Sequence, residues 1–203
     1  MTDGIAYSLI TPAGWTHLPV AAATEENLGA LVDNLAAREA QPDPRISTLR
    51  RTMLLSALEG ASSSGAQDLY FPTDLVGGVI APLSLVVSVS PRPPQGRSTS
   101  DVLLAFAAKH AGSEATSVDS RLAVRYVEEL PAQHDANGEI TVPPSRRVSL
   151  LIDSPDPAGR FLLVTGTILR IATTDDAAVM DALEFLLDSI VNTMGFESEK
   201  VRP

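Results

Sequence analysis

The sequence predicts an α+β fold: a three-layer α/β/α sandwich around a mainly antiparallel sheet of about six strands, with a long C-terminal helix packed on one face. Residues 146–195 carry most of this prediction. They read as two apolar strands, 146–153 and 160–172, followed by an amphipathic helix over about 175–194. The second strand is apolar on both of its faces, which is typical of a strand covered on both sides. The terminal helix can cover one face only, so we expect other helices on the opposite face.

The start, the end and the apolar face of the terminal helix agree with one another. Thr173 and Thr174 are candidate N-caps, Asp175 and Asp176 suit the positive end of the helix dipole, and Gly195 can end the helix in a left-handed conformation. Apolar side chains recur at helical spacing at Val179, Leu183, Leu186, Leu187, Ile190, Val191 and Met194. The opposite face is predicted to carry Asp181, Glu184, Asp188 and Asn192.

The remaining elements follow from the same periodicities and from the Pro- and Gly-rich breaks between them. Strands are expected over 7–10, 68–71, 79–90 and 140–142, and helices over 24–38, 45–58 and 102–110. Residues 116–119 and 121–129 are expected to form either a pair of strands or one bent strand. The third helix is expected to be capped by Ser98 or Ser100, and Asn137-Gly138 is typical of a β-hairpin turn. No stretch looks like a domain boundary. We therefore expect 1–203 to be a single domain with a helical hairpin insertion at about 24–58.

In the 121–129 strand, Leu122, Val124 and Tyr126 alternate with Arg121 and Arg125. This alternation predicts a half-buried strand whose arginines lie on the polar face.

The composition limits the kinds of partner and site. A net charge of −10 disfavours nucleic acid and anionic membranes as partners, since both need a basic surface. The absence of cysteine excludes disulfides, thiolate nucleophiles and thiolate metal sites. No apolar stretch is long enough to span a bilayer, and residues 1–10 lack the pattern of a secretory signal, so the expected location is the cytoplasm. The basic doublets Arg50-Arg51 and Arg146-Arg147 are expected to form surface ion pairs.

Motifs that carry chemistry are absent from the sequence. It has no Gly-x-Ser-x-Gly elbow, no phosphate-binding Gly-x-x-x-x-Gly-Lys, no Gly-x-Gly-x-x-Gly and no His-Glu-x-x-His. His17, His110 and His134 lie far apart in the chain, and nothing favours a metal site that joins them. We therefore expect no catalytic residues, no metal and no cofactor.

Two groups of residues are candidates for contact with a partner. Trp15, the only tryptophan, fits either a core position over one edge of the sheet or a surface anchor, and His17 is placed to line a pocket beside it. Asp181, Glu184 and Asp188 form an acidic helix face, which fits either simple exposure to solvent or the docking of a basic partner.

The first strand and the turn after it resemble a known family. In Tyr7-Ser8-Leu9-Ile10-Thr11-Pro12-Ala13-Gly14-Trp15 a Pro-x-Gly-Trp turn follows the strand, as in the Mog/PsbP-like superfamily. The later order of a helix after a Pro-rich loop, a run of strands and a closing helix is also similar, and LpqN-type lipoproteins share this outline. The insertion at 24–58 and the lack of cysteine depart from it. The resemblance implies an α/β/α sandwich with a non-catalytic, partner-binding role, and it carries over no catalytic residue.

The sequence therefore favours a non-enzymatic partner-binding or accessory module, one that could serve a secretion or assembly system. The alternative is a small-ligand-binding protein with a pocket between the sheet and the helical hairpin. A hydrolase or transferase with an unrecognised site is the third class, which a buried cluster of carboxylate, histidine or serine side chains would support. The expected partner is another protein. A homodimer stays open, because a free sheet edge and the serine-lined face of the 79–90 strand need covering.

Overall fold

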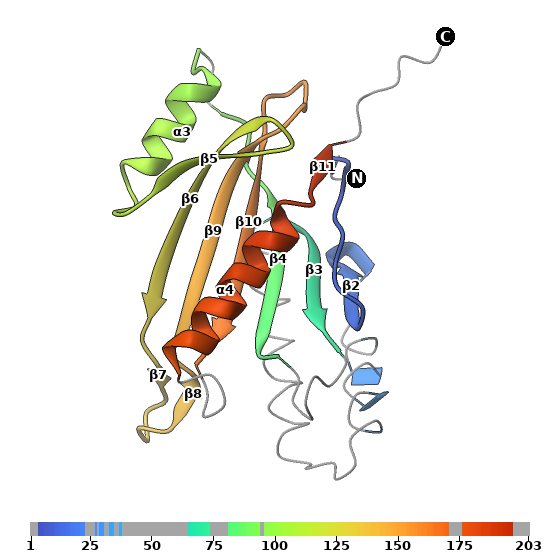
Figure 1. Ribbon diagram of the computed structural model, residues 1–203, viewed down its shortest axis with the longest axis vertical. Coiled ribbons are helices and arrows are strands. Elements are labelled where there is room, and N and C mark those ends of the chain that lie inside the picture. The colour runs from blue at the N-terminus through green and yellow to red at the C-terminus, as the bar shows by residue number, and fades with distance from the viewer. Residues whose placement is uncertain are drawn as a thin grey trace.

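The computed structural model describes residues 4–22, 65–73, 81–93, 96–170 and 176–196, and six positions between 27 and 37. Within these residues the main feature is a sheet of seven antiparallel strands (Figure 1). The strands are β2 (Trp15–Pro19), β3 (Ala66–Pro72), β4 (Leu83–Val89), β5 (Glu114–Val118), β6 (Arg121–Leu130), β9 (Ser145–Asp153) and β10 (Phe161–Leu169). Their order across the sheet is β2-β3-β4-β10-β9-β6-β5. The α+β class and the mainly antiparallel sheet are confirmed; the sheet has seven strands, where about six were expected.

Two helices lie on opposite faces of this sheet. α4 (Ala177–Val191) runs across β10 and β9, and its buried side chains share one apolar cluster with Leu162 and other residues on that side of the sheet (Figure 1). α3 (Thr99–Ala107) packs on the other face, against Leu151 and Phe161. The neighbours Phe161 and Leu162 therefore enter different apolar clusters, as the two-sided apolar pattern of this strand predicts.

α4 approaches the sheet closely at Gly166 of β10. A Cβ atom built on Gly166 would lie 2.5 Å from Cδ1 of Leu187. Leu187 is 1% exposed, so its side chain has little room to move away. The absence of a side chain at position 166 is therefore what lets the helix lie this close to the strand.

The start of the sheet corrects the sequence prediction. Instead of a strand over 7–10, the structure has β1 (Tyr7–Ser8), which among the described residues pairs only with β11 (Gly195–Phe196), in a separate two-stranded sheet. Gly14 turns the chain with a φ of 80°, and its carbonyl accepts a hydrogen bond from the N–H of Thr73 at 2.6 Å. This turn starts β2 at Trp15, which pairs with Pro72 at the end of β3. Trp15 thus belongs to a strand that the sequence analysis did not predict.

The helix caps are partly as expected. Ser98 caps α3: its side chain accepts from the N–H of Asp101 at 3.2 Å, while the Asp101 carboxylate accepts from the N–H of Ser98 at 3.0 Å. In α4 the cap is Asp176, whose carboxylate accepts from the N–H of Ala178 at 2.7 Å. The caps predicted at 173 and 174 lie outside the described residues.

Three further predictions concern the serine-lined strand, the Asn137-Gly138 hairpin and the helical hairpin over 24–58. β4 begins at Leu83, and Ser88 within it is buried, so the serine-lined face is not wholly open to solvent. The hairpin around Asn137-Gly138 is confirmed by the pairing of β7 (Gln133–His134) with β8 (Ile140–Val142). The helical hairpin predicted over 24–58 lies outside the described residues, apart from the six helical positions between 27 and 37.

The hairpin between β5 and β6 turns through two residues in the left-handed region. Asp119 has a φ of 49° and Ser120 a φ of 61°, a conformation that side chains other than glycine adopt at a cost. Asp119 also has a tertiary role, because its carboxylate accepts a hydrogen bond from the N–H of Phe196 at 2.9 Å and so ties β11 to this turn.

We expect Ser120→Gly to raise the free energy of unfolding by about 0.5 kcal/mol, since relief of backbone strain exceeds the added flexibility of the unfolded chain. Asp119→Gly relieves similar strain but loses the hydrogen bond to Phe196, so its gain should be smaller. Urea denaturation of both variants provides the measurement. Equal gains at the two positions would contradict the tethering role of Asp119.

Candidate functional site

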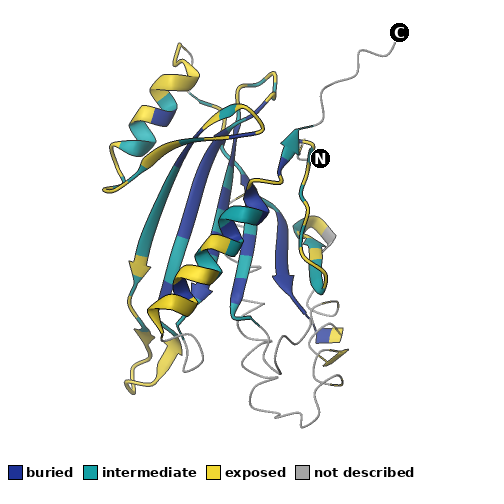
Figure 2. Ribbon diagram, viewed as in Figure 1, coloured by how far each residue is buried: buried dark blue, intermediate teal, exposed yellow. Residues whose placement is uncertain are grey.

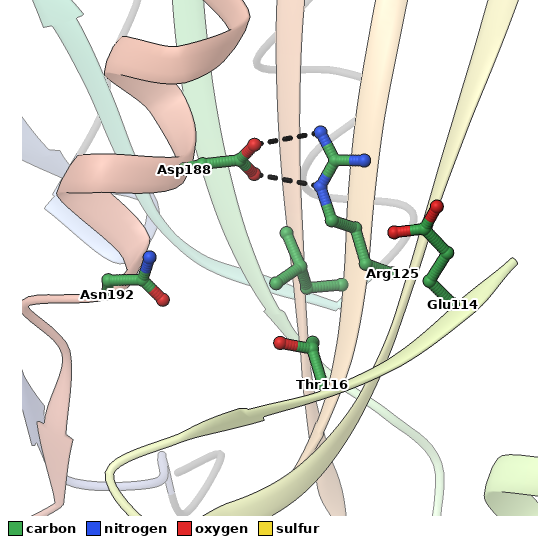
Figure 3. Close-up of a pocket in the computed structure, with 6 residues that line it drawn as sticks. Glu114, Thr116, Arg125, Asp188 and Asn192 are labelled. Carbon is green, nitrogen blue, oxygen red and sulfur yellow. Dashed lines mark hydrogen bonds and ion pairs between the residues drawn. The ribbon is translucent and has the colours of Figure 1, made fainter.

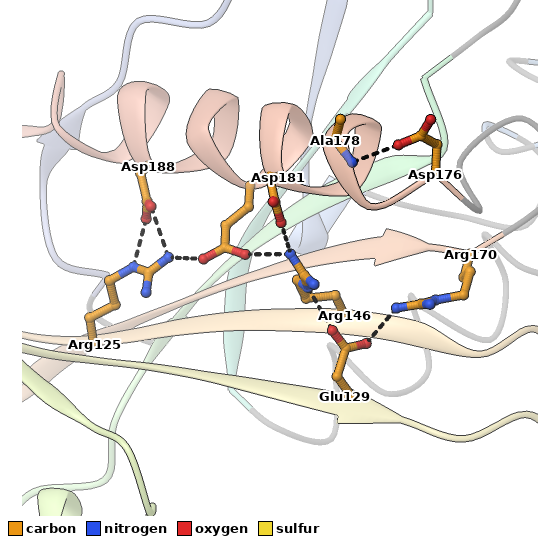
Figure 4. A network of polar contacts seen from close by, with 9 residues as sticks. Arg125, Glu129, Arg146, Arg170, Asp176, Ala178, Asp181 and Asp188 are labelled. Carbon is orange, nitrogen blue, oxygen red and sulfur yellow. Dashed lines mark hydrogen bonds and ion pairs between the residues drawn. The ribbon is translucent and has the colours of Figure 1, made fainter.

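The acidic residues of α4 face arginines of the sheet. Arg125 of β6 donates from Nε and from one terminal nitrogen to the two carboxylate oxygens of Asp188, at 2.9 and 2.8 Å (Figure 4). The same terminal nitrogen donates to Glu184 at 2.5 Å. Arg146 of β9 donates to Glu184 at 2.9 Å and to Asp181 at 2.8 Å. Burial lowers the pKa of Arg125, but its hydrogen bonds to Asp188 and Glu184 outweigh burial and raise it.

The network continues across the sheet through Glu129 of β6. Its two oxygens accept from Arg146 at 2.7 Å and from Arg170 at 3.2 Å. Hydrogen bonds from Arg146 to Asp181 and Glu129 raise the pKa of this guanidinium further. The arginines are therefore fixed positive charges, and they hold the flank of α4 against β6 and β9.

The three carboxylates lie on a flank of α4, between its core face and its outward face, and not directly opposite the core as the sequence predicts. At about 100° per residue, Asp181, Glu184 and Asp188 lie about 60–120° from Leu187, on one flank of the helix. That flank overlies β6 and β9, where the arginines reach it. The residue that points away from the sheet is Phe185, about 160° from Leu187.

Phe185 is 74% exposed, more than any other large apolar side chain in the described residues. Its neighbours on the outward face of α4 are Ala178, Ala182 and Ser189, which are too small to cover the ring, and Figure 2 shows this side of the helix as mostly exposed. A hollow of about 200 Å³ beside the ring is lined by Asp181, Glu184, Phe185 and Asp188. An aromatic side chain with a polar rim is the arrangement that protein interfaces favour.

A second depression adjoins this hollow. It is a cleft of about 360 Å³, within the range of known ligand pockets, and Asp188 borders both the cleft and the hollow. The cleft lies between the C-terminal end of α4 and strands β5, β6 and β9 (Figure 3). Its lining residues are Glu114, Thr116, Arg125, Leu150, Asp188 and Asn192. We call the hollow and the cleft together the α4 surface.

The other candidate residues, Trp15 and His17, lie on β2 at one edge of the sheet. Trp15 is half-buried and packs against the main apolar cluster, which fits the core alternative. His17 stacks on Tyr70 with ring centroids 4.6 Å apart, and its Nε2 lies 2.6 Å from Oδ1 of Asp68. Tyr7 donates from its hydroxyl to Oδ2 of Asp68 at 2.6 Å, and this hydroxyl lies 3.1 Å from that of Tyr70.

This cluster on β2 and β3 joins a carboxylate to an imidazole, as hydrolytic sites do. Asp68 is buried and both of its oxygens are occupied, by His17 and by Tyr7. No serine or threonine hydroxyl within the described residues is hydrogen-bonded to His17, so the pair is not joined to a nucleophile there. What the contacts achieve is to satisfy a buried carboxylate and to hold Tyr7 against β3.

Tyr7 gives a prediction for alkaline pH. Burial and the hydrogen bond to Asp68 raise the pKa of Tyr7 above its ordinary value of about 10. The unfolded chain loses this proton at a lower pH than the folded chain, so the stability that Tyr7 contributes is complete below about pH 10 and is lost as the pH rises further. We expect Tyr7→Phe to lose less free energy of unfolding than the unmodified protein between about pH 8 and about pH 10.5 in urea denaturation. Equal losses in both proteins would rule out this role of Tyr7.

The three histidines lie in different surroundings. His110 follows α3 and stacks on Tyr126, with ring centroids 3.8 Å apart, and His134 lies in the exposed strand β7. In the part of the chain that the structure describes, no three His, Cys, Asp or Glu side chains are grouped so that they could hold a metal ion.

The structure does not bring the two groups of candidate residues together: Trp15 and His17 belong to β2, and the acidic residues to α4. Sequence reasoning missed Phe185 and Glu114. For Phe185 a signal exists, because an aromatic residue stands outside the apolar face of a strongly amphipathic helix. Glu114 has no such signal, since its position in the cleft depends on the packing of α4.

No family model matches the chain, and no curated protein matches it. A solved structure of a mutant of the protein Mog1 is similar, with a TM-score of 0.37 and 10% sequence identity, over 70% of this chain and 87% of that one. The resemblance to the Mog/PsbP-like superfamily stays a prediction. Among the described helices, none has the length and apolar character that crossing a membrane requires.

Proposed function

We propose that this protein is a non-enzymatic partner-binding module whose contact surface is the α4 surface. The observation that carries the proposal is the exposed ring of Phe185 on a helix whose core face is already filled. A single exposed apolar side chain is common on proteins. Phe185 differs because it borders a hollow rimmed by carboxylates, next to a second depression, so that shape, apolar surface and charge coincide.

The gain from covering this ring is large enough to matter for binding. Burial of a phenylalanine side chain contributes roughly 1.5–3 kcal/mol, and interface energy concentrates in a few such residues. The carboxylates around the ring are partly held by arginines, which limits the entropy that a partner must remove when it docks. The carboxylate rim of the hollow is therefore held in place before a partner arrives.

Affinity capture from native lysate tests the proposal, with the unmodified protein, Phe185→Ser and Ile140→Ser as baits. Ile140 on β8 is 60% exposed and lies outside the α4 surface, which makes it a matched control. We expect a stoichiometric partner with the unmodified protein and with Ile140→Ser, and roughly tenfold less with Phe185→Ser. Equal capture by all three baits, or equal loss in both variants, would contradict the proposal.

The proposal extends to the architecture, the superfamily and the setting of the protein. We include the three-layer α/β/α sandwich, supported by α3 and α4 on opposite faces, and the membership of the Mog/PsbP-like superfamily, supported by residues 7–15. The net charge of −10 supports a protein partner over nucleic acid or membrane, and the cytoplasmic setting rests on the sequence expectation alone.

The alternative function, binding of a small ligand, would use the cleft beside α4. Small-molecule sites are lined mainly by apolar and aromatic side chains, whereas Leu150 is the one apolar residue among the described residues that line this cleft. The pocket predicted between the sheet and the helical hairpin involves residues outside the described ranges. We therefore assign the cleft to a side chain of the protein partner.

A further inference from the structure

One carboxylate of the cleft, on the exposed residue Glu114, has no partner among the described residues. Glu114 of β5 stands directly opposite Arg125 of β6 in the hairpin register, so their side chains rise from the same face of the sheet. Oppositely charged neighbours in this relation normally interact. Arg125 turns instead towards α4, where it binds Asp188 (Figure 3). It also binds Glu184. Within the described residues the side chain of Glu114 is left without an ion pair or a hydrogen bond.

The charge around the cleft determines which kind of group could complete this arrangement. Counted over the cleft and the adjoining ion-pair network, three arginines stand against five carboxylates, which leaves two negative charges in excess: Arg125, Arg146 and Arg170 against Glu114, Glu129, Asp181, Glu184 and Asp188. The whole chain is also negative. An anion is therefore repelled from the cleft in spite of Arg125, and a cation is attracted.

We infer, on the basis of the partner-binding function proposed above, that the partner inserts an arginine or lysine side chain into the cleft. Its charge pairs with Glu114 and Asp188, and a neighbouring apolar side chain of the same segment covers Phe185. Asp188 accepts two hydrogen bonds from Arg125, and a carboxylate offers about four acceptor positions, so it has capacity for another donor. The hydroxyl of Thr116 and the amide oxygen of Asn192 provide further acceptors in the lining.

A titration with short blocked peptides tests this inference on the full chain. The probes are acetyl-Arg-Leu-amide, its citrulline counterpart, which keeps the shape without the charge, and putrescine, a free diamine. Backbone amide shifts of Thr116 and Asn192 report on the cleft, and the amide shift of Phe185 reports on the hollow. We expect saturable shifts at all three positions with the arginine peptide at low salt, with a dissociation constant on the order of millimolar.

Two variants refine the test. Glu114→Gln removes the unpaired charge with little change of shape. We expect it to raise the dissociation constant of the arginine peptide by about threefold or more. Thr116→Arg places a cationic side chain of the protein itself in the cleft. It should abolish the amide shift that the arginine peptide causes at Asn192. The inference is overturned if the citrulline peptide shifts the cleft amides as strongly as the arginine peptide, or if Glu114→Gln binds the arginine peptide unchanged.

The remaining outcomes separate this inference from the proposed function. Peptide shifts at Phe185 alone, with none at Thr116 and Asn192, would keep the hollow as a contact surface but overturn the cation in the cleft. Shifts of the cleft amides by putrescine at lower concentration than by the arginine peptide would assign the cleft to a free diamine and would also overturn it. Loss of partner capture by Phe185→Ser tests the proposed function independently.

Discussion

Gly166→Ala is expected to lower the free energy of unfolding by about 1–3 kcal/mol, as added methyl groups do in packed cores. The direction alone is informative, because replacing glycine within a strand by alanine normally stabilises the folded state. Here the new Cβ would lie 2.5 Å from Cδ1 of Leu187, at the contact between β10 and α4. Urea denaturation of the variant gives the measurement.

The same substitution in a Leu187→Ala background is the control. Leu187→Ala alone should cost about 2–5 kcal/mol, since it empties a buried site. In that background the methyl group of Ala at position 166 enters the vacated space, so Gly166→Ala should be nearly neutral or stabilising. Additive costs of the two substitutions would show that α4 does not lie on Gly166 as described.

Arg125→Met is expected to cost about 1–3 kcal/mol, between the values for exposed and for buried ion pairs, because the side chains of Arg125 and its partners are 19–30% exposed. Methionine keeps much of the aliphatic stem but leaves Asp188 and Glu184 as neighbouring negative charges. Their repulsion is screened by salt, so the difference from the unmodified protein should shrink between about 0.05 M and about 1 M NaCl. Urea denaturation at both salt concentrations measures this.

Arg147→Met is the matched control for the network. Arg147 also stands on β9, but it faces away from α4, its side chain is 41% exposed, and its ion pair is with Glu128 at 3.0 Å. We expect this substitution to cost about 0–1 kcal/mol, with little dependence on salt. Equal costs for Arg125→Met and Arg147→Met would mean that the contacts between α4 and β6 add nothing beyond a surface ion pair.

The parts of the fold that the sequence predicts well are those with strong local periodicity. α4 and the strands β9 and β10 were expected within a few residues of their bounds, because one apolar face in the helix and two in the strands are visible over a long stretch. β2 was missed because it is five residues long, ends in Pro19 and is formed by pairing with β3, about fifty residues further along the chain.

The candidate site was harder to predict, because it depends on how elements rotate against one another. The alternation in β6 identifies two faces but not what covers each of them. The arginine face lies under α4, with the Arg125 side chain 19% exposed, whereas Leu122 on the other face is 57% exposed. The carboxylates of α4 were identified as a group, but a rotation of some tens of degrees decides whether they meet solvent or the sheet.

The central claim, that a partner covers the outward side of α4, is tested most directly by photo-crosslinking. The photoreactive residue benzoylphenylalanine replaces Phe185 in one protein and Ile140 in another, and both are irradiated in native lysate. We expect one dominant crosslinked partner from position 185 and none from position 140. A crosslinked partner from position 140 with none from position 185 would contradict the claim.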